Sequence, residues 1–392
     1  MNDMNNICKE FVRYITHEAP KYNKANVEDA ASSAFHFIKD RKVFHNQYFA
    51  VRFNYSKSDS DSFSNTVLSL SALEKYDKIP FFVVLVRKSA DNMILLANTT
   101  FLKKISHSSH ELSMTNIKGS FNGSDIMRSY GGTTNTPNNF DYLFAIHQGL
   151  EWEDNLMRLV DATSNVKPAI QKFEPRPKEL DNIFDSVRRS KEFISSKYYK
   201  VLNDDLNERC NNCRNEILIA SHIENTNIRG RLIESLITSS DEERKRIKEM
   251  LKDLENALPV YDTKNGLGDY HVEYENADTY TDIKTKVIYL NSNPKAYNVD
   301  KFLRQMADCR SVFMFFFIGV DENDIFNTLL CSVYHNKLID NTILQFHWAG
   351  RSTRGAAQFN GSAIDEMLND KHFINIIEEK QSQMFLKKLL ER

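Results

Sequence analysis

Two carboxylates and a lysine occupy positions from which they could bind a divalent cation and promote hydrolysis. Asp282 and Lys284 lie in the predicted strand Thr281–Leu290, and because strand side chains alternate they project to the same face. Asp269 opens the preceding predicted strand, after the turn Asn265–Gly268. Carboxylates that are brought together repel each other, and a divalent cation relieves that repulsion. A neighbouring ammonium group stabilises charge on a phosphate or orients water, so the pattern predicts metal-assisted phosphodiester hydrolysis.

Other acidic residues compete for the same roles. Asp278 lies only four residues before Asp282, in the predicted turn, so Asp269 is the preferred first acid. The triplets Glu378–Lys380 and Glu243–Lys245 also read acid-x-Lys, but both fall in charged helical patterns that are typical of solvated faces. The triplet at Asp282 differs from them because it lies inside a strand.

A third carboxylate could join the pair. The segment Asn227–Glu234 is predicted to open a helix with Asn227 as its N-cap. Glu234 then lies on a turn that is otherwise apolar, with neighbours Leu232, Ile233, Leu236 and Ile237. Such a carboxylate is either directed at a site or a solvent-facing residue of the helix, and the sequence leaves both readings open.

The segment His347–Gly361 is rich in residues that contact nucleic acid. It combines histidine, arginine, glutamine and asparagine with three glycines, directly after the predicted strand Ile343–Trp348. Arginine is the usual bidentate donor to guanine, glutamine and asparagine suit adenine, and glycine lets the backbone approach closely. We therefore expect four of its side chains to contact DNA: Arg351, Arg354, His347 and Gln358. The alternative is that the segment is a basic surface loop.

The composition is that of a folded protein with a balanced charge. A chain of 392 residues with 41% hydrophobic and 27% charged residues is long enough for two domains. The net charge of -2 argues against a polybasic protein but not against a local basic surface. Glycine is scarce, and neither G-x-x-x-x-G-K-[ST] nor G-x-G-x-x-G occurs, so we expect no nucleotide cofactor.

The sequence also argues against export and membrane insertion. The polar N-terminus lacks the apolar core of a secretory signal, and the most apolar run, Val312–Val320, is far shorter than the roughly 20 residues that cross a bilayer. Five scattered cysteines suit a reducing compartment. We therefore expect a cytoplasmic protein with no membrane partner.

Residues 166–180 contain three prolines and are predicted to link two domains. The domain 1–165 is predicted to be strand-rich, with a helix at Val27–Lys39 and strands at Phe49–Phe53, Phe81–Val86 and Met93–Leu96. The domain 181–392 is predicted to be α/β (α+β) with a mixed sheet. Its expected helices are Asp181–Ser196, Leu206–Ile223, Ser240–Leu258 and Asn298–Met306, and its expected strands are Gly268–Tyr274, Thr281–Leu290, Ser311–Val320, Thr328–Tyr334 and Ile343–Trp348.

The N-terminal domain carries a second group of residues suited to phosphate. Lys103, Lys104 and Arg128 lie among hydroxyl and histidine residues between short predicted strands. Such groups position a nucleic-acid backbone, although a solvated polar loop would have the same composition.

Glu234 on a helix, followed by Asp269 and then Asp282-Ile283-Lys284, resembles the PD-(D/E)XK nucleases, as used by type II restriction endonucleases. The resemblance covers mainly residues 215–350. Gly268 stands where the motif has proline, and the second acid is Asp rather than Glu. The resemblance implies a restriction-endonuclease-like core in which a mixed sheet is flanked by helices. It also implies that Asp269 and Asp282 hold Mg²⁺, that Lys284 positions or activates water, that Glu234 supports them, and that Lys286 touches a DNA phosphate.

The implied activity is that of a type II site-specific deoxyribonuclease of a restriction-modification system, which hydrolyses double-stranded DNA with Mg²⁺ and leaves 5′-phosphate ends. By the same analogy the N-terminal domain recognises DNA or an effector site, and a B3-like barrel is one form of such a domain. Both a homodimer and a monomer that nicks the strands in turn remain open. Two alternatives also remain: a methylation-dependent endonuclease whose N-terminal domain senses a modified base, and a non-catalytic DNA-binding protein.

Overall fold

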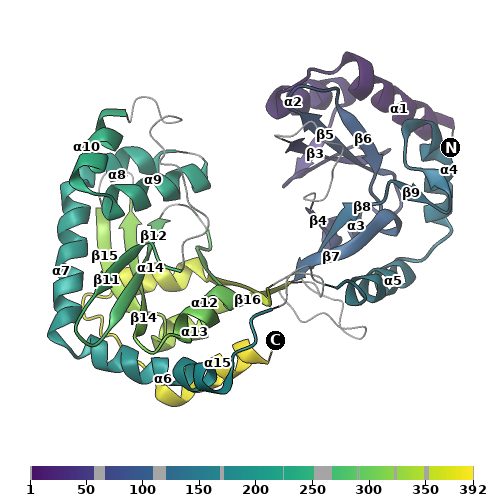
Figure 1. Ribbon diagram of the computed structural model, residues 1–392. Coiled ribbons are helices and arrows are strands. Elements are labelled where there is room, and N and C mark those ends of the chain that lie inside the picture. Colours follow the sequence, from purple (N-terminus) through teal and green to yellow (C-terminus); the bar gives the residue numbers. More distant parts are fainter. Residues whose placement is uncertain are drawn as a thin grey trace. The chain divides into compact units, whose positions relative to one another are not determined.

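The computed structural model describes residues 2–56, 67–108, 121–167, 172–223, 225–250, 267–288, 290, 292–321, 325–347 and 353–391. The chain is a mixed α/β protein that divides into two compact units. The first unit comprises Met1–Ile170 with Gln345–Ser352, and the second comprises Gln171–Leu344 with Thr353–Arg392. Figure 1 shows the elements of each unit.

The first unit contains both helices and strands. Its helical elements are α1 (Asn2–Arg13), a π-helical turn η1 (Tyr14–Glu18), α2 (Lys24–Phe35), α3 (Leu70–Lys75), η2 (Thr99–Phe101), η3 (Pro137–Asn139), α4 (Phe140–Gln148) and α5 (Trp152–Ser164). Its strands are β1 (Ile38–Asp40), β2 (Val43–His45), β3 (Ala50–Ser56), β4 (Val67–Ser69), β5 (Phe81–Arg87), β6 (Met93–Leu96), β7 (Leu102–Ser108), β8 (Phe121–Ile126), β9 (Ser129–Tyr130) and β10 (Thr133–Thr134).

A five-stranded sheet in the order β1-β2-β3-β5-β6 is the centre of the first unit. β3 and β5 are parallel, whereas β5 and β6 are antiparallel. The sheet packs a hydrophobic cluster on each face, with Val51 in one cluster and Ala50 in the other. The predicted helix Val27–Lys39 ends earlier, at Phe35, because His36 adopts a left-handed conformation with φ 52°.

The second unit alternates helices and strands. Its helices are α6 (Pro177–Ile194), α7 (Lys197–Asn212), α8 (Arg214–Ser221), α9 (Thr226–Thr238), α10 (Asp241–Met250), α12 (Val299–Met306), α13 (Asn336–Asp340), α14 (Gly361–Asn369) and α15 (Glu379–Leu390). Its strands are β11 (Tyr270–Glu273), β12 (Asp278–Val287), β13 (Lys295–Asn298), β14 (Ser311–Val320), β15 (Ile325–Ser332) and β17 (Gly355–Phe359), and β16 (Thr342–His347) runs across the boundary between the units.

The sheet of the second unit is mixed, in the order β11-β12-β14-β15. β12 and β14 are parallel, and the two outer pairs are antiparallel. Every residue of β14 is buried, because both faces of the strand are covered. On one face Met314 and Phe316 pack with apolar residues of α7, α8 and α9, and on the other Phe313 packs with Phe302 of α12. The mixed sheet and its apolar central strand agree with the sequence prediction.

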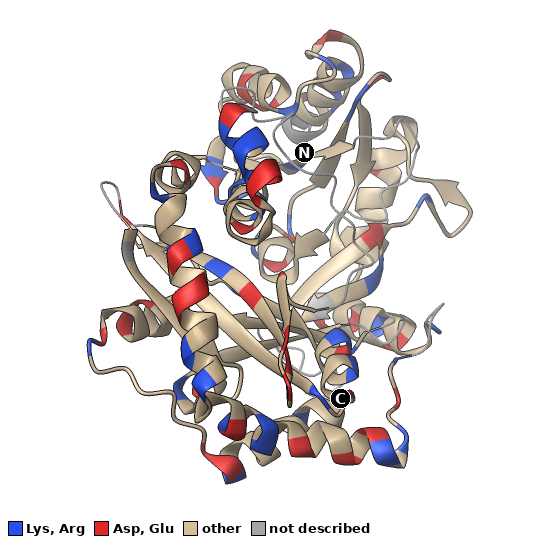
Figure 2. Ribbon diagram, turned by 60° about the vertical axis from the view of Figure 1, so that its left-hand side comes forward, with Lys and Arg blue, Asp and Glu red and all other residues tan. Residues whose placement is uncertain are grey.

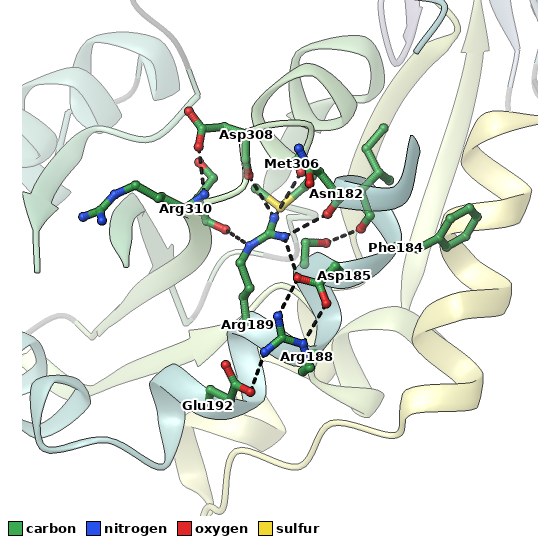
Figure 3. Close-up of polar contacts among 12 residues, drawn as sticks. Asn182, Phe184, Asp185, Arg188, Arg189, Glu192, Met306, Asp308 and Arg310 are labelled. Atoms are coloured by element: carbon green, nitrogen blue, oxygen red, sulfur yellow. Dashed lines mark hydrogen bonds and ion pairs between the residues drawn. The ribbon is translucent and has the colours of Figure 1, made fainter. Parts of the chain in front are cut away.

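A buried arginine joins α6 to the start of β14. Arg189 donates hydrogen bonds to the carbonyl oxygens of Met306, Asp308 and Ser311 at 3.1, 3.0 and 3.3 Å, and it contacts Asp185 at 3.2 Å (Figure 3). These carbonyls lie at the end of α12 and in the turn that follows. Arg189 therefore fixes the connection that leads into the central strand.

Several predicted boundaries differ from the structure. The predicted linker 166–180 includes the first turn of α6, which begins at Pro177 since proline is well suited to the first helical position. The segment Gln345–Ser352, which the prediction assigned to the domain 181–392, groups with the first unit because Phe346 and His347 pair with β7. α10 is described as far as Met250, and the rest of the predicted helix Ser240–Leu258 lies outside the described residues.

Charged residues of both signs lie along the outer helices of the second unit (Figure 2). On α6, for example, Arg188 pairs with Asp185 and Glu192. In the described part of the chain, no helix combines the length and the apolar character that crossing a bilayer requires.

The glycine before Asp269 is required by the backbone, which gives a first prediction. Gly268 has φ 93°, and a Cβ atom there would lie 2.8 Å from the Cβ of Tyr280. Gly268→Ala should lower the free energy of unfolding by roughly 1–3 kcal/mol, as measured by denaturant titration. Gly230→Ala is the control: it lies in α9 with no atom near its added Cβ and should raise stability by roughly 0.5–1 kcal/mol. Equal effects of the two substitutions would contradict this account.

Candidate active site

The candidate site lies where β11 and β12 separate. The amide of Asp269 donates to the carbonyl of Thr281 at 2.9 Å, and Tyr270 to Glu273 then pair with β12 in the opposite direction. The amide of Ile283 donates to Asp269 Oδ2 at 2.8 Å, so a side-chain carboxylate takes the place of a backbone carbonyl at the end of the ladder. Asp269 is thereby held beside the part of β12 that carries Asp282.

Asp282 and Lys284 project from the same face of β12 and form an ion pair. Lys284 Nζ lies 2.6 Å from Asp282 Oδ1. The side chain of Asp282 is 8% exposed and that of Lys284 is 22% exposed, so the pair is largely shielded but accessible from one side. The alternation that predicted their common face is therefore confirmed.

Glu234 supplies the third carboxyl group. It lies near the middle of α9, which packs its apolar side against the sheet through Leu232, Ile233 and Leu236. The carboxyl of Glu234 lies within hydrogen-bonding reach of Asp269, and Asp269 lies within the same reach of Asp282. Of the two readings that the sequence left open, the structure has Glu234 directed at the site. The N-cap of α9 is Asn225, not the predicted Asn227, because its side chain accepts from the amides of Asn227 and Ile228.

Burial dominates the ionisation of these groups. Loss of hydration raises the pKa of Asp282 well above its ordinary value, even though the charge of Lys284 opposes the shift. Burial also raises the pKa of Asp269 and of Glu234. For Lys284 burial alone would lower the pKa, but the charges of Asp282 and Asp269 outweigh burial and raise it. Lys284 is therefore held as an ammonium ion beside three carboxyl groups that compete for protons.

The donor set suits a cation that needs few protein ligands. Within the described ranges, no group of three or more His, Cys, Asp or Glu side chains has the arrangement of a complete metal site. Mg²⁺ ordinarily binds one or two carboxylates and fills its remaining positions with water and substrate phosphate. Asp269 and Asp282 fit that requirement, because their carboxyl groups are adjacent and largely buried.

The rival acid Asp278 has a structural role. It begins β12, where Arg310 binds it through two nitrogens, with distances of 3.0 and 2.8 Å to its carboxylate oxygens. Arg310 also donates to the carbonyls of Tyr274 and Glu275 in the turn before β12. The hydrogen bonds from Arg310 lower the pKa of Asp278, which therefore stays ionised and fixes the turn rather than joining the site.

Two of the residues predicted to contact DNA, Lys286 and Arg354, are buried and paired inside the fold. Lys286 shares the face of Asp282 and Lys284, but α14 covers it: the side chain is buried, donates to the carbonyl of Leu290 at 2.7 Å and pairs with Asp365. Arg354 is also buried, where it binds both carboxylate oxygens of Asp300 through its amide and guanidinium groups. Neither cation is available to a phosphate, because each is paired inside the fold.

The remaining predicted contacts have varied surroundings. Gln358 lies in β17 and donates to the carbonyl of Asn293 at 2.9 Å, and His347 ends β16 in a half-buried position. Arg351 lies outside the described residues. In the first unit Lys103 and Arg128 are exposed, whereas Lys104 pairs with Asp125 at 2.6 Å. Their contact with DNA stays a prediction.

The prediction missed one cation near the cluster. Arg231 lies three residues before Glu234 on α9, and its charge acts to lower the pKa of Glu234. The spacing was a usable signal, since residues three apart on a helix are neighbours.

The comparisons add no family assignment. The chain matches no protein-family model and no curated protein. The candidate site therefore rests on its own geometry.

The buried carboxylates predict an unusual dependence of stability on pH. A raised pKa means that Asp269 favours folding while it is protonated, and that this contribution is lost as pH rises through the raised value. In metal-free protein, Asp269→Asn should therefore raise the free energy of unfolding by roughly 0.5–2 kcal/mol at about pH 8 and change it little at about pH 4. Asparagine keeps an oxygen that can accept from Ile283, so the backbone contact persists. Denaturant titration in EDTA measures the effect.

Asp278→Asn is the matched control and should behave in the opposite way. Because Arg310 lowers the pKa of Asp278, its contribution is present above its ordinary pKa and is lost as pH falls. The substitution should destabilise the protein at about pH 8. If Asp269→Asn destabilised the protein there as well, the electrostatic account of the cluster would be wrong.

Proposed function

We propose that the second unit is a Mg²⁺-dependent nuclease of the PD-(D/E)XK type that hydrolyses phosphodiester bonds in double-stranded DNA. One observation carries the proposal: Glu234 of α9, Asp269 just before β11, and Asp282 and Lys284 of β12 converge at one point of a mixed sheet. The order and spacing of these residues resemble the motif of the restriction endonucleases, and the core of helices around a mixed sheet is consistent with that fold.

The residues have distinct roles in this proposal. Asp269 and Asp282 would hold Mg²⁺, which supplies a Lewis acid for the scissile phosphate and lowers the pKa of bound water. Lys284 is an ammonium ion, so it donates a hydrogen bond to the attacking water or to a phosphate oxygen and does not remove a proton. Glu234 orients Asp269 through the contact between their carboxyl groups. Water attacks phosphorus, the bond to the 3′ oxygen breaks, and that oxygen takes up a proton, which leaves a 5′-phosphate and a 3′-hydroxyl.

We extend the proposal to a sequence-specific type II enzyme of a restriction-modification system, with the first unit in DNA or effector recognition. The support for this extension is the resemblance of the motif alone. Either two copies cut opposite strands or one copy nicks them in turn.

Cleavage of plasmid DNA tests the proposal. The wild-type chain should cut with Mg²⁺ and stop in EDTA. Asp282→Asn and Lys284→Met should each slow cleavage roughly 100-fold or more, because each removes a group that stabilises charge in the transition state. Glu378→Gln, at the exposed acid of a rival acid-x-Lys triplet in the same unit, should cut at a rate close to that of the wild type.

Two outcomes would contradict the assignment. If wild-type protein bound DNA but did not cut it with any divalent cation, the chain would be a non-catalytic DNA-binding protein. If the wild-type chain cut DNA and both substituted chains cut it equally well, the active site would lie elsewhere.

A second candidate function, cleavage that depends on a modified base, is favoured by a cavity in the first unit. The cavity has a volume of about 640 Å³ and is lined in part by Phe82, Phe140 and Phe144. Aromatic side chains are suited to stack on a base that has been turned out of the duplex. A digest of methylated and unmethylated copies of one plasmid separates the two functions: a modification-dependent enzyme cuts only the methylated copy.

A further inference from the structure

A second cavity in the first unit is lined by an excess of positive charge. It has a volume of about 720 Å³ and lies among the β1–β2 turn, β3, β4 and α3. Its charged lining residues are Arg41, Lys42, Arg52, Lys75 and Asp40. The one carboxylate, Asp40, already accepts hydrogen bonds from Lys75 at 2.7 Å and from Tyr76 at 3.0 Å. Arg41 also lies within the electrostatic reach of Asp40, and the lining as a whole holds four cations and a single carboxylate.

Arg52 is the unusual member of this group. It lies in the middle of β3, on the face that Ala50 shares with the apolar cluster of Val83 and Leu68. Its side chain is half-buried, and burial is the cause that lowers its pKa. Among the described residues it makes no hydrogen bond or ion pair. A half-buried guanidinium without a partner loses part of its hydration with no compensating contact, and an anionic ligand would supply that contact.

Two strands of the first unit, β3 and β8, carry further polar groups without partners in the described structure. Asn54 follows Arg52 by two residues and shares its face of β3, and its buried Nδ2 has no hydrogen-bond partner in the described structure. Ser124 of β8 shares its face with the lining residue Asn122, and its buried Oγ is likewise without a partner there. Both groups can donate hydrogen bonds, but neither lines the cavity, so the site itself rests on the cations of the lining.

We propose that this cavity binds the phosphate groups of a nucleic-acid backbone. Arg52 is the inner anchor, because a guanidinium presents two parallel donors that match two phosphate oxygens. Arg41 and Lys42 are exposed on the turn between β1 and β2 and hold the adjacent phosphate. The choice of DNA as the source of the phosphate rests on the proposed nuclease function, whereas the phosphate chemistry rests on the cavity alone.

A binding measurement tests this proposal without cleavage. The full chain with Asp282→Asn is titrated against a fluorescent DNA duplex at several salt concentrations, and anisotropy is recorded. Adding Arg52→Met should weaken binding about 10-fold or more and reduce the slope of log affinity against log salt by about 1. Arg52→Lys keeps the charge but not the paired donors, so it should keep the slope while losing part of the affinity. Lys78→Met removes an exposed cation just after α3 that does not line the cavity, and it should leave both quantities unchanged.

Thermal unfolding and competition separate phosphate binding from a structural role of Arg52. Arg52→Met should not lower the melting temperature, because Arg52 has no partner to lose in the described structure.

Competition with inorganic phosphate and with a mononucleotide identifies the source of the phosphate. Neither competitor should displace bound DNA at equimolar concentration. If the mononucleotide displaces DNA, the cavity binds a free nucleotide and the DNA assignment is overturned. If Arg52→Met changes the binding of none of these probes, the phosphate site itself is refuted, whether or not the chain cleaves DNA.

Discussion

The arrangement of the site depends on how β11 leaves β12. A backbone ladder ends between Asp269 and Thr281, and the carboxylate of Asp269 then accepts the amide of Ile283, which would otherwise be unpaired at the edge of the sheet. One side chain thus both completes a strand ladder and contributes charge to the cluster. Because the contact is tied to the backbone positions of two strands, the distance between Asp269 and Asp282 is set by sheet geometry rather than by flexible side chains.

Groups far from the cluster maintain this geometry. Arg310 fixes the turn before β12 through Asp278 and two carbonyls, and Arg189 fixes the connection into β14, the parallel neighbour of β12. The strands are therefore held in register at their beginnings, before the chain reaches the carboxyl cluster. That rigidity is needed because three carboxyl groups and one ammonium ion in a buried place destabilise the fold at neutral pH, and a softer sheet would let them separate.

The sequence was informative where the chemistry is local. Alternation along one strand correctly placed Asp282 and Lys284 together, and the apolar run at Val312–Val320 correctly predicted the central strand. The sequence pattern was misleading where segments far apart in the chain determine which side chains are buried. Lys286 has the same alternation as Lys284, but α14, which lies far along the sequence, covers it. The segment around Arg354 has a composition that is typical of base recognition. Arg354 is nevertheless buried, and it is bound by Asp300, which lies 54 residues away in the sequence.

The arginines that the fold shields from water differ in whether the chain itself supplies their hydrogen-bond partners. Arg189, Arg354 and Arg158 each donate hydrogen bonds to carbonyls or to a carboxylate of the chain itself, although Nε of Arg354 and Nε of Arg158 have no partner in the described structure. Arg52 is shielded on a sheet face but has no such partner in the described structure. Its neighbours on that face include the apolar Ala50 and Val83, so part of its surroundings would suit an apolar residue as well. The anion site that we propose for the first unit would give this half-buried cation a partner.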